Sequence, residues 1–313
     1  MIDILEIGSQ ALRKAALNPG SKAYILNNEI LFRTLRKAAD RYIGGDTLDE
    51  TIDKVIMQNS NGFKCSIEYM GENTRTVSEA VGATAEFCCI VNKIKRDQHN
   101  ATVSLDLSHI GLDISERFCI ENLSIICESA NSGDIEVMIS AEGVERTDQV
   151  LNIYLEAQKR FNNLGITLQA YLYRSAEDFK ELISRKGRIR VVKGAFETPA
   201  GVSMSRGDEL DEVYLDYTEQ LLASGHLCSI ATHDKKIQDA VKNLIEKYKP
   251  GVGDYEFESL YGIQAGQLND LKNKGYPAKL YFVYGREWYL YLCNRIAEYP
   301  LNLFQALDDM LKK

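Results

Sequence analysis

Polar residues at the ends of β-rich runs are the first chemical feature of this sequence. Arg190 and Lys193 lie in the run RIRVVKG, Thr232 and His233 lie at the end of HLCSIAT, and Tyr281 lies in AKLYFVY. A fixed guanidinium stabilises a developing anion and binds a carboxylate through two hydrogen bonds. A tyrosine offers an apolar wall with a polar edge. Together these residue types indicate a site for a bound polar ligand.

Each β-rich run of the sequence has at least one polar residue at or near its carboxyl end. A buried polar side chain needs a hydrogen-bond partner, so a ring of polar residues at one end of a sheet favours a bound ligand. Any single member could instead be structural: Arg190 and Lys193 could be ion-paired strand ends, and His233 could be a local hydrogen-bond partner. The ring comprises Glu68, Asp106, Ser108, Ser140, Glu142, Gln169, Arg190, Lys193, Thr232, His233, Glu258, Tyr281 and Tyr284.

The runs that carry the ring alternate with amphipathic helical segments, such as 146–165 and 208–225. This alternation implies a parallel sheet, and eight units over about 250 residues is the count of a (β/α)8 barrel, whose active sites lie at the carboxyl ends of the strands. A doubly wound sheet is the alternative, but the sequence has no G-x-G-x-x-G turn. The expected strands are 62–70, 101–108, 134–140, 166–172, 188–194, 226–232, 254–260 and 278–284.

The first 60 residues read as helices. Leu12, Ala15 and Ala16 and then residues 30–38 show helical spacing, with the turn NPGS (18–21) between them and Asp46–Thr47 at a further helix start. We therefore predict an α/β protein: a helical segment over 1–60, followed over 61–313 by a (β/α)8 TIM-like barrel with a C-terminal helix covering the site.

Composition narrows the class of protein. The 313 residues include 37 Lys and Arg against 45 Asp and Glu, and a net charge of −8 argues against a nucleic-acid partner. The sequence contains no uninterrupted apolar run of roughly 18 residues, so we expect no transmembrane segment. No secretory signal is visible. The seven cysteines match no zinc signature, so we expect no metal site, and reduced, buried thiols in a cytoplasmic protein.

Several longer stretches form recognisable motifs. They are VSLDLSHIGLDIS (103–115), ITLQAYLYRSAEDF (166–179), RIRVVKGAFETP (188–199), IATHD (230–234), YEFESLYGI (255–263) and YFVYGREWYLYLCNRIAEYP (281–300). RVVKGAF and the helix YGREWYLYLCNRIAE are the most specific of these motifs. By these stretches the chain resembles the proline dehydrogenase family, in its short, single-function bacterial form, over nearly its whole length.

The resemblance implies an FAD-dependent oxidoreductase acting on CH–NH groups. Such an enzyme moves a hydride from the carbon beside an amine nitrogen to flavin N5 and gives an imine, and its flavin lies across the carboxyl ends of the strands. Arg190 would lie near the flavin ring, and a glycine at 194 would let backbone approach a phosphate closely. The implied cofactor contacts are Gln169, Arg190, Lys193, Gly194, Ala195, Thr232 and His233.

The resemblance also implies the substrate side of the site. The tyrosines would pack around the substrate ring, and the last helix would bind its carboxylate. In the alternative, purely structural interpretation, the tyrosines are core aromatics, and Arg295 and Glu298 form an ordinary i, i+3 side-chain pair on a helix. The implied catalytic residues are Arg190, Tyr281, Arg295 and Asp106, and the implied substrate contacts are Tyr291, Asn294, Arg295, Glu298, Ser140 and Glu258.

Four positions depart from the family pattern, all on the substrate side. Asp106 replaces a lysine, Ser140 an aspartate, Glu258 a glutamine, and Asn294 the first of two consecutive arginines. The expected pocket is about three charges more negative than the family pattern. This favours a proline-like substrate with an added cationic group or a masked carboxylate. In the alternative, Arg295 alone holds the carboxylate and proline remains the substrate.

The implied partners are a small amine or amino acid and an electron acceptor. In the family the acceptor is a membrane quinone, which would place the protein at the inner membrane surface; oxygen or a soluble carrier is the alternative. Two other functions stay open. One is a flavin-binding barrel without amine-oxidising activity, such as a sensor. The other, weaker one is a barrel that binds a phosphorylated small molecule without flavin.

Overall fold

The computed structural model describes residues 7, 11–12, 14, 18–298 and 302–311. The chain divides into two compact units. One contains Met1–Lys54 and Phe282–Lys313, and the other contains Val55–Tyr281.

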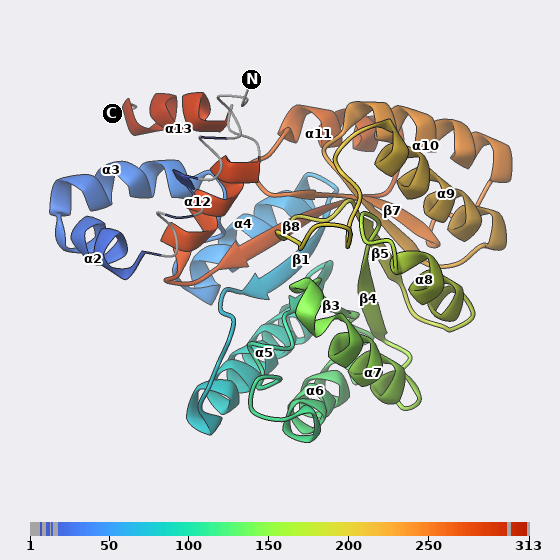
Figure 1. Cartoon of the computed structure of the whole chain (residues 1–313), viewed down its shortest axis with the longest axis horizontal. Helices are drawn as coiled ribbons and strands as arrows, with labels where there is room; N and C mark the ends of the chain where they lie inside the picture. Colours follow the sequence, from blue (N-terminus) through green and yellow to red (C-terminus); the bar gives the residue numbers. More distant parts are fainter. Residues whose placement is uncertain (1–6, 8–10, 13, 15–17, 299–301, 312–313) are drawn as a thin grey trace. The chain divides into compact units, whose positions relative to one another are not determined.

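Eight parallel strands form a closed barrel in chain order, which confirms the predicted fold class (Figure 1). Neighbouring strands pair in register, as Val103 with Val137 and Ile166 with Ile189 show. Closure leaves no strand edge unpaired, and all carboxyl ends point to one mouth. The strands are β1 (Lys64–Tyr69), β2 (Ala101–Leu105), β3 (Val137–Ile139), β4 (Leu164–Gln169), β5 (Ile189–Val192), β6 (Cys228–Ala231), β7 (Tyr255–Leu260) and β8 (Ala278–Tyr284).

Helices follow the strands in Val55–Tyr281. The first of them, α5, begins with a capping box: the Thr76 side chain accepts from Glu79 N, and the Glu79 side chain accepts from Thr76 N. Its buried face includes Phe87 and Ile90, at the spacing of an amphipathic helix. The helices are α5 (Val77–Asp97), α6 (Glu116–Asn131), η1 (Val144–Arg146), α7 (Thr147–Gln158), α8 (Ser175–Ile183), α9 (Asp208–Ser224), α10 (Lys235–Tyr248) and α11 (Ala265–Asn273).

The other unit is helical around α3 (Glu29–Asp40). Phe32 packs edge-on against Trp288 at the start of α12 (Trp288–Glu298), with ring centroids 5.4 Å apart. Arg41 donates to Asp309 of α13 (Asn302–Leu311), and its Nη2 lies 2.6 Å from Oδ1. The α4 helix (Leu48–Ser60) begins directly after Asp46–Thr47, as predicted.

Some predicted boundaries are wrong. The turn NPGS instead begins a helix, α2 (Pro19–Asn27), because Asn18 caps its amino end and Pro19 has the φ that a first helical residue needs. The strand predicted over 101–108 ends at Leu105, where a turn closes with His109 N donating to Asp106 O. Ala15 and Ala16 lie outside the described residues.

The cysteines also differ from expectation in part. All seven are free thiols, and five are buried; Cys88 is half-buried and Cys89 is exposed. Both lie on α5, away from the buried positions of that helix. Among the described residues, no helix is long and apolar enough to cross a membrane.

The interior of the barrel is charged. Strand alternation places residues i and i+2 on one face, so Arg188 accompanies Arg190 and Glu256 accompanies Glu258. Lys279 is fully buried, and its Nζ lies 2.5 Å from Glu256 Oε1 and 3.0 Å from Glu258 Oε2. Burial alone would raise the pKa of Glu256, but Lys279 and Arg188 lower it below its usual range. These ion pairs occupy space that branched apolar side chains fill in most such barrels.

Removing the buried cation should therefore destabilise the barrel. We expect Lys279→Met to lower the free energy of unfolding by about 3–5 kcal/mol, because it leaves buried carboxylates uncompensated. Urea unfolding followed by circular dichroism measures this. Lys180→Met removes an exposed lysine paired with Glu177 and should change stability by less than about 1 kcal/mol. Equal stability of the two variants would contradict the structural role of Lys279.

Candidate active site

Arg190 on β5 is the centre of the polar groups at the barrel mouth. It is 4% exposed, its Nε donates to Glu258 Oε2 at 3.1 Å, and its Nη2 lies 2.9 Å from Glu258 Oε1. Nη2 also donates to Ser104 Oγ at 2.8 Å, and Nη1 lies 3.4 Å from Thr167 Oγ1. Burial would lower the pKa of Arg190, but Glu258 raises it above its ordinary value. The guanidinium is therefore permanently charged inside the protein.

Tyr281 on β8 presents its ring to this guanidinium. The Arg190 Cζ lies 5.1 Å from the centroid of the ring, a cation–π distance. The Tyr281 hydroxyl donates to Glu68 Oε2 on β1, which also accepts from Ser140 Oγ at 2.8 Å. Burial, and then the neighbouring Glu68, raise the pKa of Tyr281 well above its ordinary value. The phenol thus stays neutral and fixed in orientation.

Asp106 adds a third carboxyl group at the mouth, after Glu258 and Glu68. Burial raises its pKa well above the usual range, and the nearby Glu68 and Glu142 raise it further. Glu142 Oε1 accepts from Ser108 N at 2.9 Å, and its Oε2 lies 3.3 Å from Arg146 Nη1. A carboxyl group with a raised pKa keeps its proton to a higher pH than an ordinary aspartate, and its carboxylate is a stronger base, which suits general acid–base chemistry.

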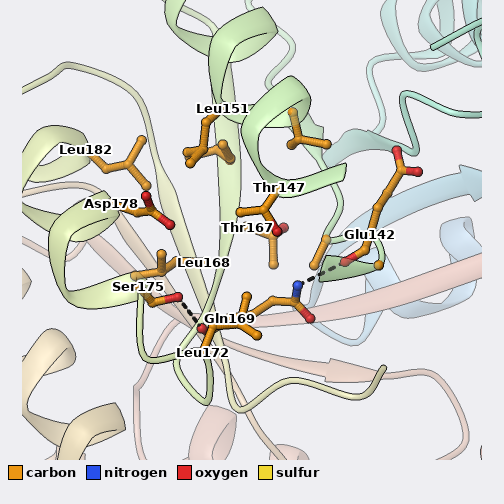
Figure 2. A pocket seen from close by; sticks show the side chains of 14 residues that line it. Glu142, Thr147, Leu151, Thr167, Leu168, Gln169, Leu172, Ser175, Asp178 and Leu182 are labelled. Carbon is orange, nitrogen blue, oxygen red and sulfur yellow. Dashed lines mark hydrogen bonds between the residues drawn. The ribbon is translucent and has the colours of Figure 1, made fainter. Parts of the chain in front are cut away.

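Gln169 at the end of β4 carries an unpaired atom. Its side chain is 6% exposed, and its Nε2 donates to Glu142 O at 3.0 Å, as Figure 2 shows. Its Oε1 has no hydrogen-bond partner among the residues that the structure describes. Buried amide oxygens are almost always paired, so this atom fits a hydrogen-bond donor on a ligand. The small cavity in Figure 2 lies between β4 and helices α7 and α8, with Leu151 and Leu182 among its lining residues.

Lys193 and Gly194 follow β5. Lys193 Nζ lies 2.5 Å from Asp211 Oδ1 and 2.7 Å from Asp234 Oδ2, which leaves one of its three N–H groups for another acceptor. Gly194 has φ +112°, and a Cβ there would overlap the Tyr171 ring. Only glycine adopts this turn without strain. Ala195, the next residue, is exposed.

Thr232 and His233 follow β6. Thr232 is buried, and its Oγ1 accepts from Asp234 N at 3.1 Å. His233 Nε2 accepts from Leu260 N at 3.0 Å, so a neutral ring carries its proton on Nδ1. Asp234 therefore joins Thr232 to Lys193, and these residues form one group beside the strand ends.

Three of the remaining residues lie on α12, in the helical unit. Tyr291, Asn294 and Arg295 are half-buried there, and the Arg295 guanidinium carbon lies 5.1 Å from the centroid of the Tyr291 ring. Asn302 Nδ2 donates to Arg295 O at 3.1 Å, which joins α13 to the end of α12. Glu298 is the last residue of α12, and its side chain lies outside the described part of the structure.

Four residues of the barrel contact Arg190, Glu258 or Tyr281 although the sequence did not predict it. Glu68 stood in the ring of polar residues but was given no role, and Ser104, Thr167 and Lys279 were not singled out. The two-residue period of a strand could have indicated two of them. Ser104 lies two residues before Asp106, and Lys279 lies two residues before Tyr281, so each shares a face with a residue of the ring. The structure brings together Glu68, Ser104, Asp106, Ser140, Arg190, Glu258, Lys279 and Tyr281.

Known sequences are similar to this chain over most of its length. A family model described as proline dehydrogenase matches residues 51–299. Proline dehydrogenase 1 of Bacillus subtilis (strain 168) is 34% identical over 278 residues, which cover 89% of this chain and 92% of that protein. Proline dehydrogenase of Deinococcus radiodurans is 29% identical over 312 residues, which cover 97% of this chain and 99% of that protein.

Solved structures agree in fold. A crystal structure of proline utilization A (PutA) from Bdellovibrio bacteriovorus matches with a TM-score of 0.77 and 18% identity, over 93% of this chain and 41% of that one. A Bradyrhizobium japonicum PutA mutant matches with a TM-score of 0.71 and 16% identity, over 99% of this chain and 42% of that one. The chain thus spans less than half of these PutA chains, and the likeness shows the fold. The family match over residues 51–299 and the identity to the Bacillus relative show that this chain belongs to the proline dehydrogenase family.

Proposed function

We propose that this protein is an FAD-dependent oxidoreductase that oxidises the C–N bond of proline or a proline-like amino acid to an imine. The observation that carries the proposal is the buried, permanently charged Arg190, which faces the ring of a neutral Tyr281 at the mouth of the barrel. Membership of the proline dehydrogenase family supports it.

The residues at the mouth fit a flavin. Gln169 offers a buried oxygen that accepts no hydrogen bond from the described part of the chain, which suits an N–H donor of a flavin ring. Gly194, in the turn directly after β5, is the proposed backbone contact for a ribityl or phosphate group. The remaining N–H of Lys193 suits a phosphate oxygen, and Ala195, Thr232 and His233 complete the proposed cofactor contacts.

Arg190 and Tyr281 would then each have a defined role beside the flavin. When bound, the flavin supplies the hydride acceptor, at N5. Arg190 stabilises negative charge beside it, because the surrounding hydrogen bonds hold the guanidinium in place before the reaction begins. The Arg190 contacts leave one of its five N–H groups for a ligand. Tyr281 forms one wall for the substrate and, through Glu68, stays in one orientation.

Asp106 is a suitable acceptor for the proton that must leave the substrate nitrogen. An amine gives up a hydride from its neighbouring carbon only when the nitrogen is unprotonated, so an ammonium substrate needs a proton acceptor. The raised pKa of Asp106 makes its carboxylate a stronger base than an ordinary aspartate. We propose that Asp106 accepts this proton, while Ser140 keeps Glu68 hydrogen-bonded beside it.

The charge of the mouth also bears on the substrate. Burial and then the neighbouring Glu142 raise the pKa of Glu68, and burial and then Glu68 and Glu142 raise the pKa of Asp106. An added cationic group on a proline-like substrate would be stabilised beside these carboxyl groups. Arg295 would bind the substrate carboxylate, with Tyr291, Asn294 and Glu298 beside it. The proposed electron acceptor is a quinone, oxygen or a soluble carrier.

Anaerobic flavin reduction tests the function directly. The purified protein should show the absorbance of bound FAD, and that band should bleach when the right amine is added. The panel comprises L-proline, hydroxyprolines, other cyclic amines and cationic amino acids, each added separately. If L-proline bleaches the flavin as fast as any other amine, the modified-substrate proposal is wrong. A yellow protein that no amine reduces would instead identify a non-catalytic flavin-binding barrel.

Removing the proposed carboxylate-binding residue should weaken substrate binding. Arg295→Ala should lower kcat/KM by roughly 10- to 100-fold, mostly through KM, because a hydrogen bond to a charged group contributes about 1.5–3 kcal/mol. Steady-state kinetics and FAD content measure this, and the FAD content should stay unchanged. Arg117→Ala, at an exposed position on α6, should match wild type. Equal kinetics of the two variants would exclude Arg295 from substrate binding.

Asp106→Asn should lower the activity and raise the stability of the protein. Because the pKa of Asp106 is higher in the folded than in the unfolded chain, its ionised form destabilises the fold above about pH 4. The variant should therefore be more stable than the wild type at pH 7, with the gain vanishing near pH 4. Its flavin reduction should slow by roughly 100-fold or more. Thermal unfolding against pH, with rapid-mixing absorbance, checks both effects; unchanged reduction would remove Asp106 from proton transfer.

A further inference from the structure

The ion pair between Arg190 and Glu258 has a consequence for the cofactor. We infer that Glu258 is a positioning residue that lowers the reduction potential of the bound flavin, by compensating part of the Arg190 charge. This inference rests on the proposed function, in which Arg190 faces the flavin.

Both carboxylate oxygens of Glu258 contact cationic side chains. Oε1 lies 2.9 Å from Arg190 Nη2, while Oε2 accepts from Arg190 Nε at 3.1 Å and lies 3.0 Å from Lys279 Nζ. Glu258 is 3% exposed and Lys279 is fully buried. Two-point contact with one guanidinium fixes the geometry of both groups. Glu258 is thus held in place by cations, and its oxygens are directed toward them.

Lys279 makes the charge of this group depend on Glu258. Its Nζ is shared between Glu258 and Glu256, and Glu256 has no contact with Arg190 among the ion pairs of the described residues. Arg190 therefore has one carboxylate partner in this group, and that partner is Glu258. Without that negative charge, both Arg190 and Lys279 would act more strongly on a ligand at the mouth.

The sign of the effect follows from simple electrostatics. Adding a hydride equivalent makes a flavin ring more negative, so nearby positive charge favours the reduced form. Interactions between charges are strong in a buried site, because the surroundings screen them far less than water does. Glu258 weakens the positive field of Arg190 and so keeps the potential lower than Arg190 alone would set it.

The test is the reduction potential of bound FAD in Glu258→Gln, measured by spectroscopic redox titration of the holoenzyme. We expect the reduced-to-oxidised equilibrium to shift about tenfold toward reduced flavin, which is about 30 mV upward for a two-electron couple. Glu256→Gln is the matched control. It lies on the same strand, is buried, and contacts Lys279 at 2.5 Å, yet it should shift the equilibrium less than about threefold.

The outcomes separate this inference from the proposed function. A wild-type protein that binds no FAD would overturn both. Bound FAD with an unchanged or lower potential in Glu258→Gln would overturn the role of Glu258 alone. If that variant does not retain FAD, Glu258→Asp serves instead: its shorter carboxylate moves away from Arg190, and the equilibrium should shift by about threefold toward reduced flavin. An unchanged equilibrium in Glu258→Asp would then overturn the inference.

Discussion

A guanidinium buried in the interior of a barrel is the constraint on which the rest of this structure depends. Taking Arg190 out of water costs several kcal/mol, and only close, well-oriented partners offset that cost. Glu258 supplies the opposite charge, and Ser104 and Thr167 accept from the remaining N–H groups. Glu258 then needs a second cation, Lys279, which in turn brings Glu256 into the core. One charge required by the site thus determines the polarity of several strands.

The closed parallel barrel is what makes such a cluster possible. Each strand contributes side chains inward at every second residue, and closure brings strands far apart in sequence to one axis. Glu68 on β1 therefore meets Tyr281 on β8, although these residues lie 213 positions apart in the chain. A mouth built in this way is rigid, because its groups lie on strands or directly after them, where the backbone is fixed by its ladder of hydrogen bonds.

The sequence predicted the architecture and the location of the polar ring, because strand and helix periods are local and eight alternations have few other solutions. It did not predict which polar groups pair. That Glu258 binds Arg190, or that Lys193 lies between Asp211 and Asp234, depends on the register and on long side chains crossing the barrel. The helix at Pro19 was missed because Asn-Pro-Gly-Ser is also typical of a turn. The roles of the α12 residues, like those of the ring, stay predictions that the proposed experiments test.

The shared lysine also affects how the chain can acquire its fold. Glu256 and Glu258 lie on β7, and their common counter-ion, Lys279, lies on β8. A chain made from its amino end carries both carboxylates before it carries Lys279. Until then Glu258 can pair with Arg190, and Glu256 with Arg188 and Lys64, but the cation that the two carboxylates share is missing. The group of buried charges is therefore complete only when β8 has taken its place in the barrel.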